Sequence, residues 1–276
     1  MQVHTGEAQE MEVWQQDMAV APSETREIAV SLVNCSLSFG DVHVLKHVSL
    51  DIYENEFVSI LGPSGCGKST LLRLMLELLA PNPGGKVVYA AAKPSIGIVF
   101  QKPVLMPWLT ARQNIELTLK MGPNKKKLGK QERREKAEAS LELVGLQDFT
   151  NHYPHQLSGG MQQRISIARA LAADPTILLM DEPFGALDEF TREKLNFELL
   201  RLWESPTTSL SSVVMVTHSI QESVIMSDRV VMMSPRPAGV EDILTVPLPR
   251  PREVGMEELP AFYQTVKELR KRVKHQ

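Results

Sequence analysis

Short apolar runs alternate with longer stretches of helical periodicity from Ile28 onward. Four of these runs are almost wholly apolar, which is typical of strands buried on both faces of a parallel sheet. Strands that alternate with helices predict an α/β fold with a parallel sheet at its centre. The four runs occupy residues 57–61, 96–100, 177–180 and 213–216.

The stretches between these runs predict two further layers and one irregular segment. Residues 103–172 are rich in Glu, Lys, Gln and Leu at helical spacing and predict a helical insert. Residues 42–52 alternate apolar and polar positions, so we expect an antiparallel layer beside the parallel core. Repeated prolines over 235–251 predict a poorly structured stretch after the last core strand.

The two ends of the chain differ from the central domain, residues 28–250. Residues 1–27 hold six acidic side chains against Arg26 alone and predict a loosely ordered acidic extension. Residues 251–276 predict an amphipathic helix with a basic end. We expect it to pack on its own domain, with contact between its basic end and anionic lipid as the alternative. Its apolar face consists of Leu259, Phe262, Val266, Leu269 and Val273.

Composition and charge limit the class of protein. The 276 residues carry a formal net charge of -3, which gives no overall cationic field for nucleic acid. Cys35 and Cys66 are too few for a disulfide framework, and no apolar run is long enough to span a bilayer. The N-terminus lacks the cationic start and apolar middle of a signal peptide. These features predict a soluble globular protein of the cytoplasm that does not bind nucleic acid.

The strongest local signal is a phosphate-binding loop that follows the strand 57–61. Its residues match the pattern G-x-x-x-x-G-K-[ST] and open a helical run that starts at Thr70. Backbone amides of such a loop surround a phosphate, the lysine reaches the β- and γ-phosphates, and the serine ligates Mg²⁺. We expect Cys66 to be exposed in this loop and therefore sensitive to alkylation. The loop consists of Gly62, Pro63, Ser64, Gly65, Cys66, Gly67, Lys68 and Ser69.

Polar side chains follow three other predicted strands. Asp181 and Glu182 end the strand 177–180, and because ligands bind at the carboxyl ends of parallel strands, both acids should lie near the phosphate loop. Asp181 can then hold Mg²⁺, while Glu182 can orient or deprotonate the attacking water. His218 follows the strand 213–216 and can bind the γ-phosphate. Gln101 follows the strand 96–100, and its amide can join the Mg²⁺ and water shell, although spacing alone does not decide this.

A further motif narrows the range of protein families that this phosphate loop fits. Residues 157–164, Leu-Ser-Gly-Gly-Met-Gln-Gln-Arg, resemble the signature motif of ABC-type ATPases, and the resemblance extends over 28–250 in the family's order. It implies a P-loop NTPase fold: a RecA-like parallel sheet core, an antiparallel β layer and a helical signature-motif subdomain. It also implies ATP and Mg²⁺ as cofactors, with Ser69, Gln101 and Asp181 at the metal. The implied nucleotide contacts are the phosphate loop with Thr70, and Phe39, Ser158, Gly159, Gly160, Met161 and Asp188.

The family assigns the remaining roles and a partner. Phe39 resembles the aromatic residue that stacks on adenine, Gln101 the Q-loop glutamine, and His218 the switch histidine. The residues 158–160 open a helical run and make a second phosphate-binding corner, which in this family closes over the ATP of the opposite subunit. The resemblance therefore implies a head-to-tail dimer, most simply a homodimer. Two departures from the family are Met161, where glutamine is commonest, and Ser219, where an acid often follows the histidine.

Finer features resemble the ATP-binding subunits of bacterial nitrate/sulfonate/taurine-type importers. That branch implies a separate transmembrane permease, an extracytoplasmic solute-binding protein and a location at the inner face of the membrane. Alternatives are the motor of an export or lipid-transport complex, a soluble ABC ATPase of DNA repair or translation, and a regulator without turnover. The resembling residues are 99–110, 153–156, 181–188 and 227–237.

Apolar residues close behind Gln101 predict a surface for the permease. In this family a short cytoplasmic helix of the permease docks beside the Q-loop, so a surface here would link the nucleotide site to the partner. The alternative is that these side chains pack inside the helical insert. The residues are Leu105, Met106, Trp108 and Leu109.

Overall fold

The computed structural model describes residues 26–90, 94–121 and 128–274. The predicted acidic extension lies almost wholly outside this range, and so do the three consecutive lysines 125–127. Among the described residues, no helix is long and apolar enough to cross a membrane.

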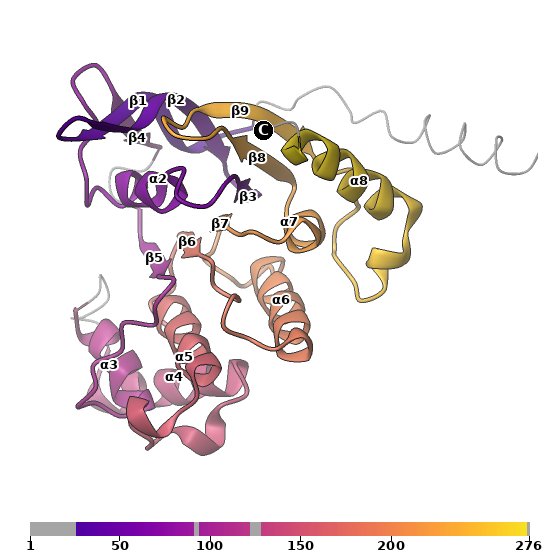
Figure 1. The fold of residues 1–276 in the computed structure, drawn as a ribbon. Coiled ribbons are helices and arrows are strands. Elements are labelled where there is room, and N and C mark those ends of the chain that lie inside the picture. Colours follow the sequence, from indigo (N-terminus) through magenta and orange to yellow (C-terminus); the bar gives the residue numbers. More distant parts are fainter. Residues whose placement is uncertain (1–25, 91–93, 122–127, 275–276) are drawn as a thin grey trace, which may run out of the picture.

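A six-stranded sheet forms the centre of the molecule (Figure 1). Five neighbouring strands are parallel, whereas the edge strand β9 runs antiparallel to β8. The four predicted runs are strands of this sheet, so the predicted parallel core is confirmed. In spatial order the strands are β5 (Ile96–Val99), β6 (Ile177–Asp181), β7 (Ser212–Val216), β3 (Phe57–Leu61), β8 (Arg229–Met233) and β9 (Val240–Thr245).

The prediction of a poorly structured stretch over 235–251 is wrong in part, because β9 lies within it. Its exposure alternates weakly, with Leu244 buried and Ile243 exposed, as expected for an edge strand. The strand exists because β8 offers a free edge, and the two pair from Arg229 with Thr245 to Met233 with Val240. Pairing of this kind depends on the neighbour rather than on local periodicity.

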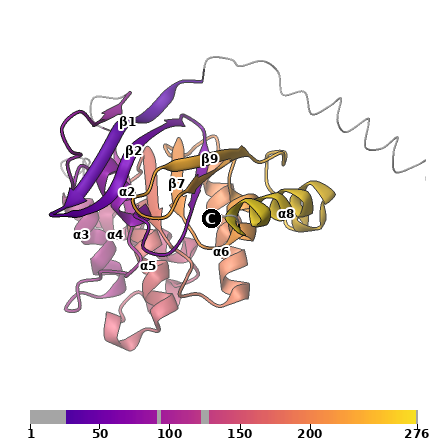
Figure 2. The same cartoon turned by 45° about the horizontal axis from the view of Figure 1, so that its top comes forward.

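A smaller antiparallel sheet lies beside the parallel one, as the alternating pattern of 42–52 predicts. It has the order β2 (Val42–Tyr53), β1 (Ile28–Phe39), β4 (Lys86–Tyr89). The strands β1 and β2 are joined by a tight turn in which Gly40 has a φ of 56°. Figure 2 shows this sheet and the C-terminal helix α8 (Pro260–Lys274) on opposite flanks of the molecule, as Figure 1 does.

Alternation along the central strands divides the interior into two cores. In β3, Phe57 and Leu61 face the first core, whereas Val58 and Ile60 face the second. The second core lies between the parallel sheet, the antiparallel sheet and the helix α2 (Lys68–Met75). The first core is covered by α3 (Ala111–Met121), α4 (Lys130–Leu143), α5 (Gly159–Leu171), α6 (Glu189–Trp203), α7 (Ile220–Met226) and α8.

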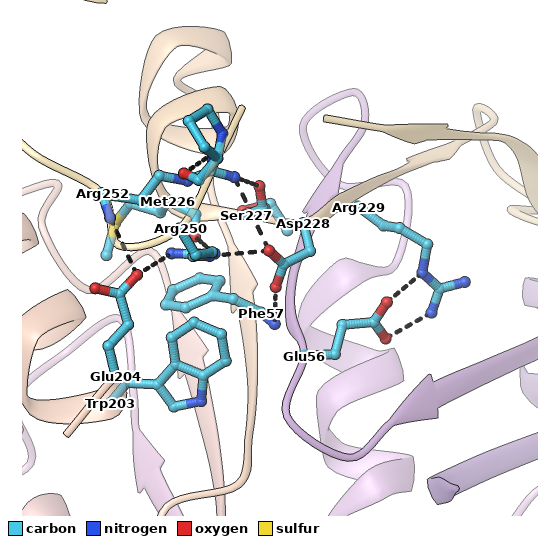
Figure 3. A network of polar contacts seen from close by, with 12 residues as sticks. Glu56, Phe57, Trp203, Glu204, Met226, Ser227, Asp228, Arg229, Arg250 and Arg252 are labelled. Atoms are coloured by element: carbon cyan, nitrogen blue, oxygen red, sulfur yellow. Dashed lines mark hydrogen bonds and ion pairs between the residues drawn. The ribbon is translucent and has the colours of Figure 1, made fainter. Parts of the chain in front are cut away.

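The segment between β9 and α8 is clamped to the core by two arginines (Figure 3). The guanidinium of Arg250 lies 4.6 Å above the ring of Trp203 and donates to Asp228 at 2.9 Å and to Glu204 at 3.0 Å. Arg252 is buried and donates to two backbone carbonyls, those of residues 227 and 249. Burial lowers the pKa of Arg252 to about 10. Beyond this clamp, α8 buries Phe262, Val266 and Leu269 against the first core.

Candidate nucleotide site

The phosphate loop joins the end of β3 to the start of α2. Gly67 has a φ of 131°, and a Cβ at this position would come within 3.0 Å of the side chains of Val44 and Leu45. Glycine is therefore required where the loop meets the antiparallel sheet. The side chain of Lys68 is buried, and its Nζ donates to the carbonyls of Gly62 at 2.8 Å and Pro63 at 2.9 Å. The amine of Lys68 is thus bound by backbone carbonyls of the loop to which it belongs.

The expectation that Cys66 is exposed is wrong. The residue is only 2% exposed and belongs to the second core. Its Sγ lies 3.2 Å from the position that a Cβ on Gly62 would take, so the thiol fills space beneath the curled backbone. The motif places this residue in the loop, but the packing of the loop against the core turns its side chain inward.

Three predicted residues meet at the carboxyl edge of the parallel sheet. Gln101 follows β5, Glu182 follows β6, and His218 follows β7. The Nε2 of Gln101 donates to Oε2 of Glu182 at 2.9 Å, and Nε2 of His218 forms a short hydrogen bond with Oε1. Glu182 adopts the left-handed backbone conformation with a φ of 48°. This conformation is unfavourable for any residue other than glycine, and residues that adopt it cluster at functional sites.

Asp181 supplies the feature that a divalent cation requires. It ends β6, is buried, and its Oδ1 has no hydrogen-bond partner. Burial raises the pKa of this carboxyl, while the hydroxyl of Ser69 and the charges of Arg73 and Lys68 oppose the rise. An unpartnered buried carboxylate oxygen beside a serine hydroxyl fits Mg²⁺, which takes oxygen ligands from one or two carboxylates and from phosphates. Within the described ranges no cluster of three or more His, Cys, Asp or Glu offers a cage made of protein alone.

The predicted second corner lies at the start of α5. Ser158 caps this helix, and its Oγ accepts from the amide of Met161 at 3.2 Å. Gly160 lies against the 185–188 segment, because a Cβ there would come within 3.3 Å of the carbonyl oxygen of Ala186. Gly159 has open space around it. The backbone amides at this helix start are therefore accessible to an anion.

Asp188 and Phe39, two further predicted nucleotide contacts, are both exposed. Asp188 is exposed and caps α6, where its Oδ1 accepts from the amide of Thr191 at 3.0 Å. This hydrogen bond is the main cause that lowers the pKa of Asp188. Phe39 ends β1 with 51% of its surface exposed, so its ring is available for stacking.

The two anion-binding helix starts belong to opposite faces of the parallel sheet. The buried side chains of α2 lie in the second core, whereas those of α5 lie in the first. The polar edge formed by Gln101, Glu182 and His218 stands with the phosphate loop at the carboxyl ends of the strands. The start of α2 is therefore grouped with the second core and the start of α5 with the first.

A family model described as "ABC transporter" matches residues 45–185, which include the phosphate loop, the start of α5 and Asp181 with Glu182. The chain belongs to the ABC transporter family. As a member of this family it is an ATPase that uses ATP and Mg²⁺.

Relatives of this ABC ATPase include proteins of an archaeon and of cyanobacteria. It is 46% identical to an uncharacterized ABC transporter ATP-binding protein of Methanocaldococcus jannaschii, over 77% of this chain and 78% of the relative. It is 43% identical to a nitrate import ATP-binding protein of Synechococcus elongatus, over 78% of each. It is 42% identical to a bicarbonate transport ATP-binding protein of a Synechocystis strain, over 82% of this chain and 80% of the relative.

Solved ABC cassettes share the fold. One, whose structure is a dimer in a post-hydrolysis state bound to ADP and Pi, superimposes with a TM-score of 0.69 at 38% identity. The match covers 78% of this chain and 98% of that cassette. The predicted fold class is confirmed by this likeness and by the mixed sheet described above.

Three hydrogen bonds of this ABC ATPase are not predicted by its sequence. Arg236, from the loop after β8, donates to the carbonyl of Gly65 at 2.6 Å and so supports the phosphate loop. The signature helix holds the Q-loop segment, because Gln163 donates to the carbonyl of Phe100 at 3.2 Å and Arg169 donates to that of Val104 at 2.8 Å. Arg236 and Gln163 lie within motifs visible in the sequence. Hydrophobic periodicity and motif spacing do not indicate, however, which side chain will reach the carbonyl of a distant residue.

Proposed function

We propose that this ABC ATPase is the motor subunit of a bacterial importer, in which ATP hydrolysis at a homodimer interface drives a separate transmembrane permease. The observation that carries the catalytic part is the arrangement of Glu182, whose two oxygens are bound by Gln101 and His218. A carboxylate oriented from both sides beside a phosphate loop suits a general base for water attack on the γ-phosphate.

The residues of the site take the following roles. Lys68 leaves the carbonyls of its own loop and binds the β- and γ-phosphates, while the amides of the loop surround them. Ser69, Asp181 and Gln101 would hold Mg²⁺, which would supply positive charge to the phosphate oxygens when bound. Glu182 orients the attacking water and accepts its proton. His218 binds the γ-phosphate and keeps Glu182 in place.

A second copy of the chain completes the site. The start of α5 exposes the amides of residues 158–160 on the face opposite to α2, so it suits the phosphates of another chain. Phe190, two residues after Asp188, is 85% exposed, and an apolar ring of this exposure beside a polar loop is typical of an interface. The dimeric cassette structure among the relatives supports the same arrangement.

The permease contact lies behind Gln101. Trp108 is 69% exposed, and Tyr153 is also exposed on the neighbouring segment, where the amide of Ala111 donates to the carbonyl of His152 at 2.8 Å. Two exposed aromatic rings beside the Q-loop fit an anchor site for a partner helix. Leu105 packs against the first core, so for this residue the alternative of internal packing holds, and Met106 and Leu109 are half-buried.

The solute class follows from the named relatives. The nitrate and bicarbonate proteins support small anions, and the importer branch implies an extracytoplasmic solute-binding protein and a position at the inner face of the cell membrane. The second candidate is the motor of an export or lipid-transport complex. Reconstitution with the permease into proteoliposomes separates the two candidates, because the importer requires the solute-binding protein on the side opposite to ATP.

The catalytic proposal is tested by Lys68→Ala, with the exposed Lys86→Ala on β4 as the matched control. Loss of a charge from the transition state should lower Mg²⁺-dependent ATP hydrolysis by roughly 100-fold or more. Lys86→Ala should hydrolyse ATP at the wild-type rate. Wild-type turnover by Lys68→Ala would overturn the assignment of the loop.

A further inference from the structure

The loop that carries His218 is closed by hydrogen bonds that do not use the imidazole. The Oγ1 of Thr217 accepts from the amide of Ser219 at 3.1 Å, and the Oγ of Ser219 accepts from the amide of Glu222 at 3.2 Å. The hydroxyl of Thr217 in turn donates to Oε2 of Glu222. The residues before and after His218 are thus both bonded to Glu222 in the first turn of α7, Thr217 to its carboxylate and Ser219 to its backbone amide.

Glu222 is a buried acid that the reaction itself does not require. It is 7% exposed, and its neighbours Thr217 and Asn196 are buried as well. Burial raises the pKa of Glu222, whereas the hydrogen bond from Thr217, the charge of Arg192 and a hydrogen bond from Asn196 lower it. Burying a carboxyl is unfavourable unless its partners compensate, so this acid is expected to do something that an apolar residue could not.

The residues around Glu222 also include Arg192 of α6, the helix that Asp188 caps. Arg192, which acts on Glu222 from the helix α6, donates to the carbonyl of Leu187 at 3.0 Å. Asp188 caps that helix one turn earlier. Glu222 therefore has partners both in the loop of His218 and on α6, and Arg192 of α6 is in turn bonded to Leu187.

We propose that Glu222 is a positioning residue that holds His218 against Glu182 by fixing the hydroxyl of Thr217. The inference rests on the role proposed above for His218 and adds to it the group that keeps the histidine in reach. When the hydroxyl of Thr217 donates to Glu222, the oxygen of Thr217 is oriented to accept a hydrogen bond from the amide of Ser219. This bond fixes the orientation of the peptide group that follows His218. Without this acceptor the hydroxyl rotates and the histidine loop loses that restraint.

A serine at position 219 suits this arrangement of hydrogen bonds. In this chain the residue after the histidine caps α7 and accepts from the amide of Glu222 itself. A hydroxyl makes this bond without placing a second negative charge beside the buried carboxylate. Ser219 and Glu222 thus form a local pair in which each orients the turn that follows His218.

The test compares Glu222→Leu, which removes the acceptor, and Thr217→Val, which removes the donor, with Ser223→Ala, a control that removes another buried hydroxyl of α7, one that donates only to the carbonyl of Ile220. Misplacement of a catalytic group lowers turnover by about 10- to 100-fold without a matching loss of binding. Both test variants should therefore lower kcat by at least that lower factor, with the KM for ATP and the melting temperature close to wild type. Ser223→Ala should keep the wild-type kcat. Wild-type kcat in both test variants would overturn the proposal.

A double-mutant cycle with His218→Ala separates positioning from a general structural role. If Glu222 acts through the histidine, Glu222→Leu should lower kcat no further once His218 has been replaced. Independent, multiplicative losses would overturn the inference while leaving His218 in its role. Wild-type activity of His218→Ala alone would instead remove the proposed role of the histidine, and the inference with it. If Glu222→Leu does not fold, Thr217→Val with His218→Ala completes the same cycle.

Discussion

Gln101 donates a hydrogen bond of 2.9 Å to Glu182, and this bond joins the end of β5 to the end of β6 across 81 residues of sequence. His218 binds the other oxygen of the same carboxylate. Residues at the ends of three adjacent strands therefore fix the orientation of one carboxylate at the edge of the sheet where we propose that the nucleotide binds. Gln101, the Q-loop glutamine, already contacts this group, which is proposed to activate water. Any movement of Gln101 must change the environment of Glu182.

Glu182→Gln should bind ATP but hydrolyse it at a rate lower by orders of magnitude, because an amide keeps the shape of the side chain and cannot accept the proton. ATP should then hold two chains together, so size-exclusion chromatography with ATP should show a long-lived dimer. Glu193→Gln, an exposed acid on α6, is the matched control and should turn over normally. A monomer under all conditions, also after crosslinking, would contradict the shared site.

Trp108→Ser should weaken capture of the permease while ATP affinity and melting temperature stay at wild-type values. The exposed ring contributes little to folding, but a buried aromatic anchor at an interface is worth about 2 kcal/mol or more. Copurification from detergent extracts measures the effect. Met121→Ser removes another exposed apolar side chain of the helical subdomain and should leave capture unchanged. If Trp108→Ser also retains full capture, the coupling surface lies elsewhere.

Arg252→Ala should destabilise the fold, because two backbone carbonyls lose their buried donor and the segment before α8 loses its clamp. The expected loss in the free energy of unfolding is about 2–4 kcal/mol, measured by urea denaturation. Arg270→Ala, on the exposed face of α8, should change it by less than about 0.5 kcal/mol. Equal effects in both variants would show that the clamp does not hold the C-terminal segment.

The stability of the wild type relative to Glu222→Gln should fall as the pH rises from 4.5. Burial raises the folded-state pKa of Glu222 above its usual value of 4.5, so the native state holds the proton more tightly than the unfolded chain does. The contribution of this group is complete below that value and is lost as the pH rises through the folded-state pKa. Urea denaturation of both proteins between pH 4.5 and neutrality measures the difference, and a wild-type advantage that grows with pH would contradict it.

Cys66 should resist alkylation in the folded protein, because its side chain is buried beneath the phosphate loop. Cys35 is buried too, and burial raises the pKa of its thiol. Titration with a thiol reagent should give slow reaction under native conditions and two thiols per chain after denaturation. Rapid reaction of one thiol in the native protein would mean that the loop opens far enough to expose Cys66.

The sequence was sufficient for the parts of the site that depend on local pattern. Apolar runs marked the strands buried on both faces, and since parallel strands end at the same edge, the polar residues after them were expected together. Gln101, Glu182 and His218 do meet there. The phosphate loop and the start of α5 were also visible from spacing, because their chemistry depends on consecutive backbone amides.

Only the tertiary structure decided the features that depend on a distant neighbour. The strand β9 forms because β8 has an edge to pair with, and Cys66 is buried because the antiparallel sheet and α2 close over the second core. The role proposed for Glu222 depends on Thr217, which directly follows β7, and on Arg192 of α6. Periodicity describes which face of its own element a residue occupies, whereas pairing, burial and hydrogen-bond partners are set by the elements that pack against it.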